Sequence, residues 1–221
     1  MPTTKHILVY SDSLTWGIVP TTRQRLPFER RWPGVLYAEL NAGGDERVRL
    51  TEDCLNGRRT AFDDPYKPGR NALNGVQQVI EAQSPLDLVI VLLGTNDFPS
   101  MHDHRPWHSA TGTGALINAI RTAPIEPGMP VPPILVVAPP QLDNPRGPIG
   151  PKFEGGDLAS RGLAEALRRV SEETGCAFFD SNTATTSSKR DGVHLDADQH
   201  ETLGKAIAPL VAELLANNTT L

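Results

Sequence analysis

Two apolar runs most constrain what this chain can fold into. The sequences LDLVIVLL at 86–93 and PILVVAP at 133–139 are almost continuously apolar. A strand with one solvated face alternates apolar and polar residues, whereas a parallel strand buried on both faces reads as an unbroken apolar run. The chain is therefore predicted to contain a parallel sheet with helices packed on both of its faces.

Predicted strands and helices alternate along the chain. The strand candidates are Ile7–Tyr10, Val48–Thr51, Leu86–Leu93, Ile134–Ala138 and Ala177–Phe179, and the helix candidates are 31–40, 71–83, 113–123, 158–174 and 197–216. Right-handed crossovers between parallel strands then give an α/β fold, a three-layer α/β/α sandwich with a five-stranded parallel sheet. Loops rich in proline and glycine separate the elements and no repeat interrupts them, so residues 1–221 are predicted to form a single domain.

Charge and hydropathy exclude two classes of partner. The 21 lysines and arginines against 26 aspartates and glutamates give a net charge of −5, which argues against a nucleic-acid-binding protein. No apolar stretch reaches the ~20 residues of a membrane span, and the first apolar run is too short for a signal peptide. A cytoplasmic location follows as the expectation.

The only cysteines, Cys54 and Cys176, are expected to be free thiols at opposite edges of the sheet.

Polar residues gather in four segments that follow strands or precede the last helix. They are Ser11-Asp12-Ser13, CLNGRRT at 54–60, GTND at 94–97 and DGVHLD at 191–196. In open parallel sheets, ligands bind outside the carboxyl ends of the strands. We therefore expect these four segments to meet at one site.

In these segments the sequence resembles the SGNH, or GDSL, hydrolase superfamily. SDSLTWG at 11–17 is similar to its first block, Gly57 to the glycine of the second, GTND to the third and DGVH to the fifth. RWPGVL at 31–36, DDP at 63–65, FEGG at 153–156 and DGVHLDADQ at 191–199 extend the likeness to the bacterial arylesterase and acyltransferase branch. The resemblance implies a flavodoxin-like SGNH hydrolase fold and, for this branch, a homo-oligomer.

The resemblance places Ser13 at the nucleophile, with His194 and Asp191 as its partners. An alcohol is a poor nucleophile at neutral pH and needs a base within hydrogen-bond reach. His194 is the candidate base and later the acid for the leaving group. Asp191, three residues upstream, can accept the imidazole N–H and fix the tautomer.

The oxyanion of an acyl-transfer intermediate needs hydrogen-bond donors. The backbone N–H groups of Ser13 and Gly57 and the side-chain amide of Asn96 are the three candidates. The segment after the third strand is expected to be a loop that overhangs the site, with Phe98 and Trp107 as part of a substrate wall. Trp16 is a further substrate-binding candidate at the rim.

One position departs from the family. The first block usually begins with glycine, and here the residue is Ser11. If the position needs a positive φ or close backbone approach, serine costs roughly 1 kcal/mol or more. If the position is ordinary β-strand, serine is tolerated and its hydroxyl enters the network near the site. The sequence leaves both alternatives open.

The sequence MHDHRPWH at 101–108 allows a rival interpretation. The side chains of His102, Asp103, His104 and His108 are of types that bind zinc. However, no strand pattern in this segment places His102 and His104 on the same face. No metal or organic cofactor is predicted.

The leading hypothesis is a serine esterase that cleaves small short-chain or aryl esters through an acyl-enzyme, which water or another acceptor resolves. The alternatives are a carbohydrate deacetylase, a lysophospholipase or thioesterase, and a catalytically weak binding module.

Overall fold

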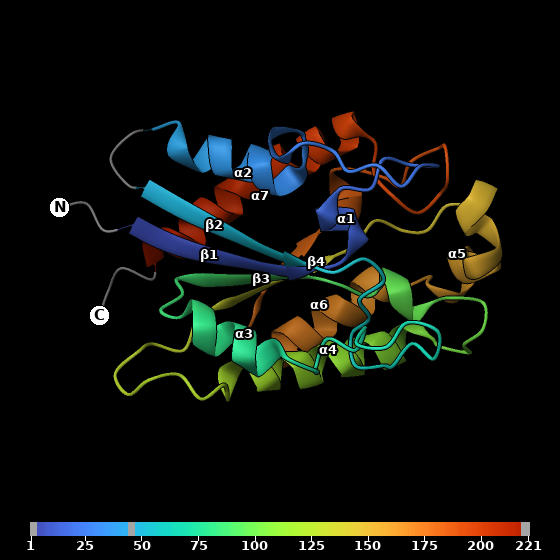
Figure 1. Cartoon of the computed structure of the whole chain (residues 1–221). Coiled ribbons are helices and arrows are strands. Elements are labelled where there is room, and N and C mark those ends of the chain that lie inside the picture. The colour runs from blue at the N-terminus through green and yellow to red at the C-terminus, as the bar shows by residue number, and fades with distance from the viewer. Residues whose placement is uncertain (1–3, 44–46, 218–221) are drawn as a thin grey trace.

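The fold is built on a parallel sheet in the order β2-β1-β3-β4-β5 (Figure 1). The computed structural model describes residues 4–43 and 47–217. The strands are β1 (Thr4–Ser11), β2 (Arg47–Cys54), β3 (Leu88–Leu92), β4 (Ile134–Ala138) and β5 (Ala177–Asp180), and every neighbouring pair is parallel. Each overlaps a strand expected from the sequence, so the predicted five-stranded parallel sheet and three-layer sandwich are confirmed.

Successive side chains of the central strands enter two separate cores. Ile7 and Val9 of β1 pack into one hydrophobic cluster, and Leu8 and Tyr10 pack into the other. All four side chains are fully or almost fully buried. Because alternate side chains of a strand point to opposite faces, burial of all four requires a helical layer on each face.

Helices α2 (Trp32–Asn41) and α7 (Ala197–Asn217) cover one face, together with the short α1 (Ser13–Trp16). Figure 1 shows this layer above the sheet, with α2 and α7 side by side. Their close approach depends on Gly204, where a Cβ would lie 2.7 Å from the carbonyl oxygen of Trp32.

Helices α3 (Val76–Gln83), α4 (Pro106–Arg121) and α6 (Leu163–Thr174) cover the other face. Two of these helices begin five residues later than the sequence indicated, α3 at Val76 and α6 at Leu163. Before α6, Gly162 with φ of +86° separates it from the short α5 (Gly156–Ala159). Helix α4 instead begins seven residues earlier than expected, and the expected loop therefore ends at Arg105. Pro106 occupies its first turn, and the His108 side chain accepts from the backbone N–H of Arg105.

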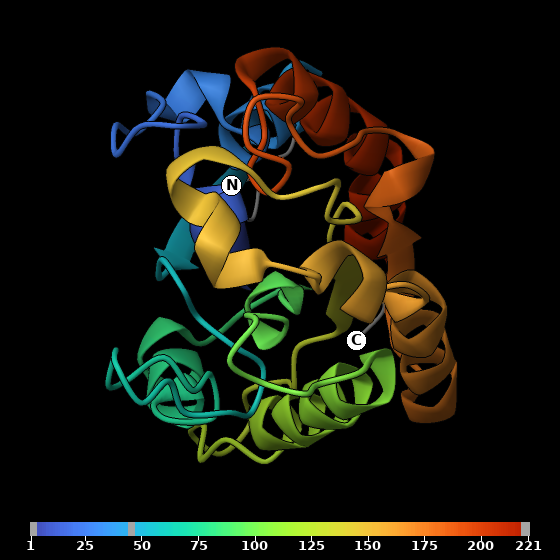
Figure 2. The same cartoon turned by 90° about the vertical axis from the view of Figure 1, so that its right-hand side faces the viewer.

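The carboxyl ends of all five strands lie at one edge of the sheet, and Figure 2 views the molecule from that side. The four polar segments singled out from the sequence lie at this edge, and a connection containing the 3₁₀ helix η3 (Gly147–Phe153) runs across it. None of the helices described is long and apolar enough to cross a membrane.

Candidate active site

The turn from β1 into α1 presents Ser13 at the edge of the sheet. Asp12 precedes it as the N-cap, and its Oδ1 accepts the backbone N–H of Leu14 at 2.9 Å. Its Oδ2 accepts from Nδ2 of Asn96 at 2.9 Å. Complete burial raises the pKa of Asp12 to about 6, while these hydrogen bonds favour its ionised form. Asp12 therefore fixes both the start of α1 and the position of the Asn96 amide.

His194 and Asp191 form a buried pair on the turn before α7. The His194 Nδ1 lies 2.8 Å from Asp191 Oδ2, while Oδ1 accepts the backbone N–H groups of Val193 and His194 at 2.9 Å each. Burial acts to raise the pKa of Asp191, but the hydrogen bonds from His194 and the backbone outweigh it and hold the pKa below its usual value. An ionised Asp191 needs a proton on Nδ1, which leaves Nε2 of a neutral His194 as the basic nitrogen.

Three donors gather beside Ser13. Within residues 4–43 and 47–217, the backbone N–H groups of Ser13 and Gly57 have no hydrogen-bond acceptor. Gly57 has φ of +86°, a conformation that glycine adopts at no steric cost. Asn96 lies in the 3₁₀ helix η2 (Thr95–Asp97), and its amide has a second hydrogen besides the one given to Asp12.

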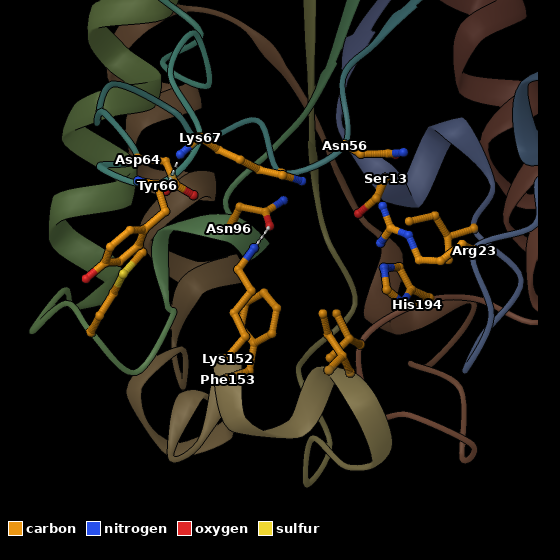
Figure 3. A pocket seen from close by; sticks show the side chains of 15 residues that line it. Ser13, Arg23, Asn56, Asp64, Tyr66, Lys67, Asn96, Lys152, Phe153 and His194 are labelled. Atoms are coloured by element: carbon orange, nitrogen blue, oxygen red, sulfur yellow. Dashed lines mark hydrogen bonds between the residues drawn. The ribbon is translucent and has the colours of Figure 1, made fainter.

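A cavity of about 420 Å³ joins these groups, since Ser13, Gly57, Asn96 and His194 all line it (Figure 3). The remaining apolar lining is Ile18, Met101, Ile149, Phe153 and Val193, and the remaining polar lining is Arg23, Asn56, Asp64, Tyr66, Lys67 and Lys152. The geometry thus combines a hydroxyl, a carboxylate-paired imidazole and free N–H donors around one concave space. Such an arrangement can carry out acyl transfer.

Comparison with known protein families decides the assignment. Residues 12–202 match the GDSL-like lipase/acylhydrolase family. The chain belongs to this family. A search of curated protein sequences gives no match.

Two solved structures illustrate the likeness of this GDSL hydrolase to known enzymes. Est24, a carbohydrate acetylesterase from Sinorhizobium meliloti, is 34% identical with a TM-score of 0.88, and the alignment covers 95% of this chain and 99% of Est24. The M. smegmatis aryl esterase is 33% identical with a TM-score of 0.88 and the same coverage. Family and neighbours together make the chain a serine hydrolase of carboxylic esters on the GDSL fold.

The structure corrects the predicted substrate wall of this GDSL hydrolase. Phe98 is buried in the core and only 1% exposed. Trp107 lies on α4 with 67% of its surface exposed, in a separate hollow against α6. Trp16 packs under the guanidinium of Arg25 instead of lining the cavity. The expected loop is helical at Trp107, and the indole lines that hollow and not the cavity that Ser13 lines.

The histidines of the MHDHRPWH segment contact an arginine. Arg59 Nη1 lies 2.7 Å from His102 Nε2, and its Nη2 lies 3.1 Å from His104 Nδ1. His108 accepts from the backbone at the start of α4. Among the residues that the structure describes, no group of three or more histidine, cysteine or acidic side chains could hold a metal ion.

Ser11 is an ordinary strand residue. It ends β1 in register with Cys54 and Leu92, so the alternative that requires a positive φ is wrong. Its hydroxyl donates to the carbonyl of Leu92 at 2.7 Å and accepts from Thr15 at 2.6 Å. Arg58 supports the same turn by donating to the Ser11 carbonyl at 2.9 Å.

Sequence reasoning missed the cations of the cavity. Arg23 and Lys67 come from two loops and Lys152 from the 3₁₀ helix η3, and nothing in their local sequence says that their side chains face Ser13. The segment 139–156, which follows β4, contributes Ile149 and Lys152 to the cavity.

Proposed function

We propose that Ser13 is the nucleophile of this GDSL hydrolase, that His194 is its general base and that Asp191 orients His194. The observation that carries the proposal is that Ser13 and the Asp191-paired His194 line the same cavity as three donors suited to an oxyanion. Retention of all these groups argues against a catalytically weak binding module.

The proposed reaction has two halves. Nε2 of His194 takes the hydroxyl proton of Ser13 as Oγ attacks the ester carbonyl, and the oxyanion accepts from the N–H groups of Ser13 and Gly57 and from the Asn96 amide. His194 then protonates the leaving alkoxide, and the acyl group remains on Ser13. Water, activated by the same imidazole, cleaves the acyl-enzyme and regenerates the hydroxyl.

Small esters are the proposed substrates. A cavity of about 420 Å³ lies at the small end of ligand pockets, which suits a short acyl group or an aryl ester. The neighbours named for aryl esters and for acetylated carbohydrates support the same size class, and acetate release from an acetylated sugar tests the deacetylase alternative. Ile18, Ile149 and Val193 line the same cavity as His194, and this apolar surface favours transfer to an alcohol as a second fate of the acyl group. The cytoplasmic location and the homo-oligomer stay predictions of the sequence.

Covalent labelling tests the nucleophile. An aryl phosphonate should modify the wild-type protein once, and peptide mapping should find the phosphonate on Ser13. Ser13→Ala should not label and should lose nearly all hydrolysis of p-nitrophenyl acetate. Ser11→Ala is the matched control, because it removes the neighbouring hydroxyl and should still label. It should cost about 1–3 kcal/mol of stability by leaving the Thr15 O–H without its acceptor. A phosphonate on Ser11, or labelling of Ser13→Ala, would show that the wrong hydroxyl is assigned.

A further inference from the structure

The cavity beside Ser13 carries more positive charge than an uncharged ester needs. Arg23, Lys67 and Lys152 all line it, against the single carboxylate of Asp64. In the described part of the chain, no ion pair joins any of these three cations to a carboxylate. The chain as a whole is acidic, with a net charge of −5, so this local excess opposes the average charge of the protein.

Lys152 is the most constrained of the three cations. It is half-buried, and its Nζ donates to Oδ1 of Asn96 at 3.3 Å and lies 5.0 Å from the centre of the Phe153 ring. Burial lowers the pKa of Lys152; the charge of Asp64 opposes this shift, and the charge of Lys67 adds to it. An anion bound beside this ammonium group would favour its protonated form, which burial and the charge of Lys67 disfavour.

Lys67 faces Lys152 across the cavity (Figure 3). Its side chain is exposed and passes Gly57, with Nζ 4.0 Å from the place a Cβ would occupy there. Asp64 Oδ1 accepts the backbone N–H groups of Tyr66 and Lys67 at 2.9 and 3.0 Å, and among the described residues its carboxylate forms no ion pair with the Lys67 ammonium. The space between Lys67 and Lys152 is therefore positive and open to a ligand.

The proposed reaction determines which part of an ester would reach this space. The leaving oxygen must face His194, which protonates it, and the carbonyl oxygen must face Gly57 and Asn96. The acyl substituent then extends away from His194. Figure 3 shows Lys67 and Lys152 on the side of Ser13 away from His194, whereas Arg23 lies beside His194.

We propose that Lys67 and Lys152 bind an anionic group on the acyl part of the substrate, so that the enzyme prefers half-esters of dicarboxylic acids to neutral esters of the same size. This inference rests on the proposed function, because the acyl direction follows from the roles given to Ser13 and His194. A carboxylate two or three bonds beyond the ester carbonyl would lie between the two ammonium groups and pair with both.

A different role for the same cations makes a different prediction. If Lys67 and Lys152 only stabilise the oxyanion, their removal slows every ester by the same factor. If they bind an anion on the substrate, removal slows the charged ester more than the neutral one. The ratio of the two kcat/KM values separates these cases.

The experiment compares monomethyl succinate with methyl levulinate, which has an acetyl group in place of the carboxylate, and follows methanol release. The wild-type protein should prefer monomethyl succinate. Lys67→Met should lower the ratio of the two kcat/KM values roughly tenfold, the factor that corresponds to about 1.4 kcal/mol. Lys67→Glu should lower it further, and added salt should lower the wild-type ratio by screening.

Lys205→Met is the matched control. Lys205 is an exposed lysine of α7 that pairs with Glu201, so this variant makes the same charge change away from the cavity. Its ratio should equal that of the wild-type protein. Lys67 makes no side-chain hydrogen bond or ion pair in the described structure, so Lys67→Met should fold normally.

The outcomes separate the two proposals. Equal rates for the two methyl esters, or equal slowing of both by Lys67→Met, would overturn the anion site and leave the esterase mechanism intact, provided that phosphonate still labels Ser13. Absence of labelling would overturn the mechanism and this inference together. A preference for 3-acetoxybenzoate over 3-acetoxybenzamide, without one for monomethyl succinate, would place the anion beside Arg23 and overturn the acyl-side assignment.

Discussion

At the scale of single residues, Asp191 illustrates how one side chain serves both structure and proposed chemistry. Oδ1 closes the turn by accepting two backbone N–H groups, and Oδ2 holds the ring of His194 at 2.8 Å. Because the backbone bonds fix the carboxylate, its orientation does not depend on the imidazole. The histidine is therefore placed by a group that is itself held in place.

Substitutions at this pair should abolish turnover and leave the fold intact. Asp191→Asn keeps the size of the side chain but no longer favours a proton on Nδ1 of His194. The kcat of this variant for p-nitrophenyl acetate should therefore fall by roughly 10³–10⁴, and the kcat of His194→Ala should fall by at least as much. His108→Ala is the control, since it removes a histidine that does not line the cavity. Near-normal turnover of His194→Ala would remove it as the base.

The residue scale also shows what sequence patterns can predict about a site. Ser13, Gly57, Asn96 and His194 were found because each stands in a short motif at the end of a strand or before a helix, where the backbone dictates the location. Lys152 carries no such signal, because its long flexible side chain on η3 can turn to either side. Its contact with Asn96 became visible only when η3 was placed in space.

At the scale of elements, the turn between β5 and α7 depends on Gly192. It has φ of +74°, and a Cβ there would lie 2.2 Å from the carbonyl oxygen of Asp143. The backbone N–H of Asp143 in turn donates to the Gly192 carbonyl at 3.0 Å. The loop that follows β4 is therefore packed directly against the turn that carries Asp191 and His194.

Gly192→Ala should lower both stability and activity. The clash must displace the turn, so we expect kcat/KM to fall by more than tenfold and the unfolding midpoint to fall as well. Gly175→Ala is the matched control, because Gly175 also has a positive φ, +63°, but has no atom within 4 Å of its Cβ position. It should cost about 1 kcal/mol of stability and leave kcat/KM unchanged. Equal kinetic effects of the two variants would contradict this role for Gly192.

The joint between α2 and α7 contains a buried histidine that should make stability depend on pH. His200 Nδ1 accepts the backbone N–H of Trp32 at 3.3 Å, and its buried Nε2 has no partner among the residues described. Burial, helped by the charge of Arg31, lowers the pKa of His200 to about 3. The unfolded chain therefore binds a proton that the folded chain does not, and stability is lost as the pH falls below the unfolded value of ~6.5.

His200→Asn tests this dependence, since it keeps an acceptor for Trp32 and does not titrate. Urea midpoints measured from about pH 7 to about pH 4 should fall more steeply for the wild-type protein than for the variant. The raised pKa of Asp12 acts in the opposite sense, but it is common to both proteins and cancels in the comparison. Parallel curves would contradict the assignment.

The boundaries of a helix or strand could be predicted from the sequence where hydrophobic burial alone determines them. Strand β4 (Ile134–Ala138) matches its expected bounds because burial on both faces leaves an unbroken apolar run. Helix α4 was expected to begin at residue 113, because its first turns, from Pro106 on, carry polar residues that show no apolar stripe. Capping at Arg105 determines where α4 begins, and hydrophobic periodicity does not reveal a helix start of this kind. The error in placing Trp107 followed from that missed turn.

At the scale of the whole molecule, sheet order determines how far apart the two cysteines lie. Cys54 ends β2 at one edge, and Cys176 immediately precedes β5 at the other. Four strand spacings of about 4.8 Å separate these edges by about 19 Å, far above the ~7 Å limit between the Cα atoms of a disulfide. Both thiols are free in the structure. Titration of unreduced, denatured protein should therefore give two thiols per chain.

The same cysteines can test whether residues 1–221 behave as a single domain, which stays a prediction of the sequence. Cys54 packs against the hydrophobic cluster under α2 and α7, and Cys176 packs against the cluster under α4 and α6. The two clusters lie on opposite faces of one sheet and share its strands, so neither should survive loss of the other. Brief thiol labelling across a urea series, with each cysteine read by peptide mass, should give the same midpoint for both. Separate midpoints would mean that the two helical layers unfold independently.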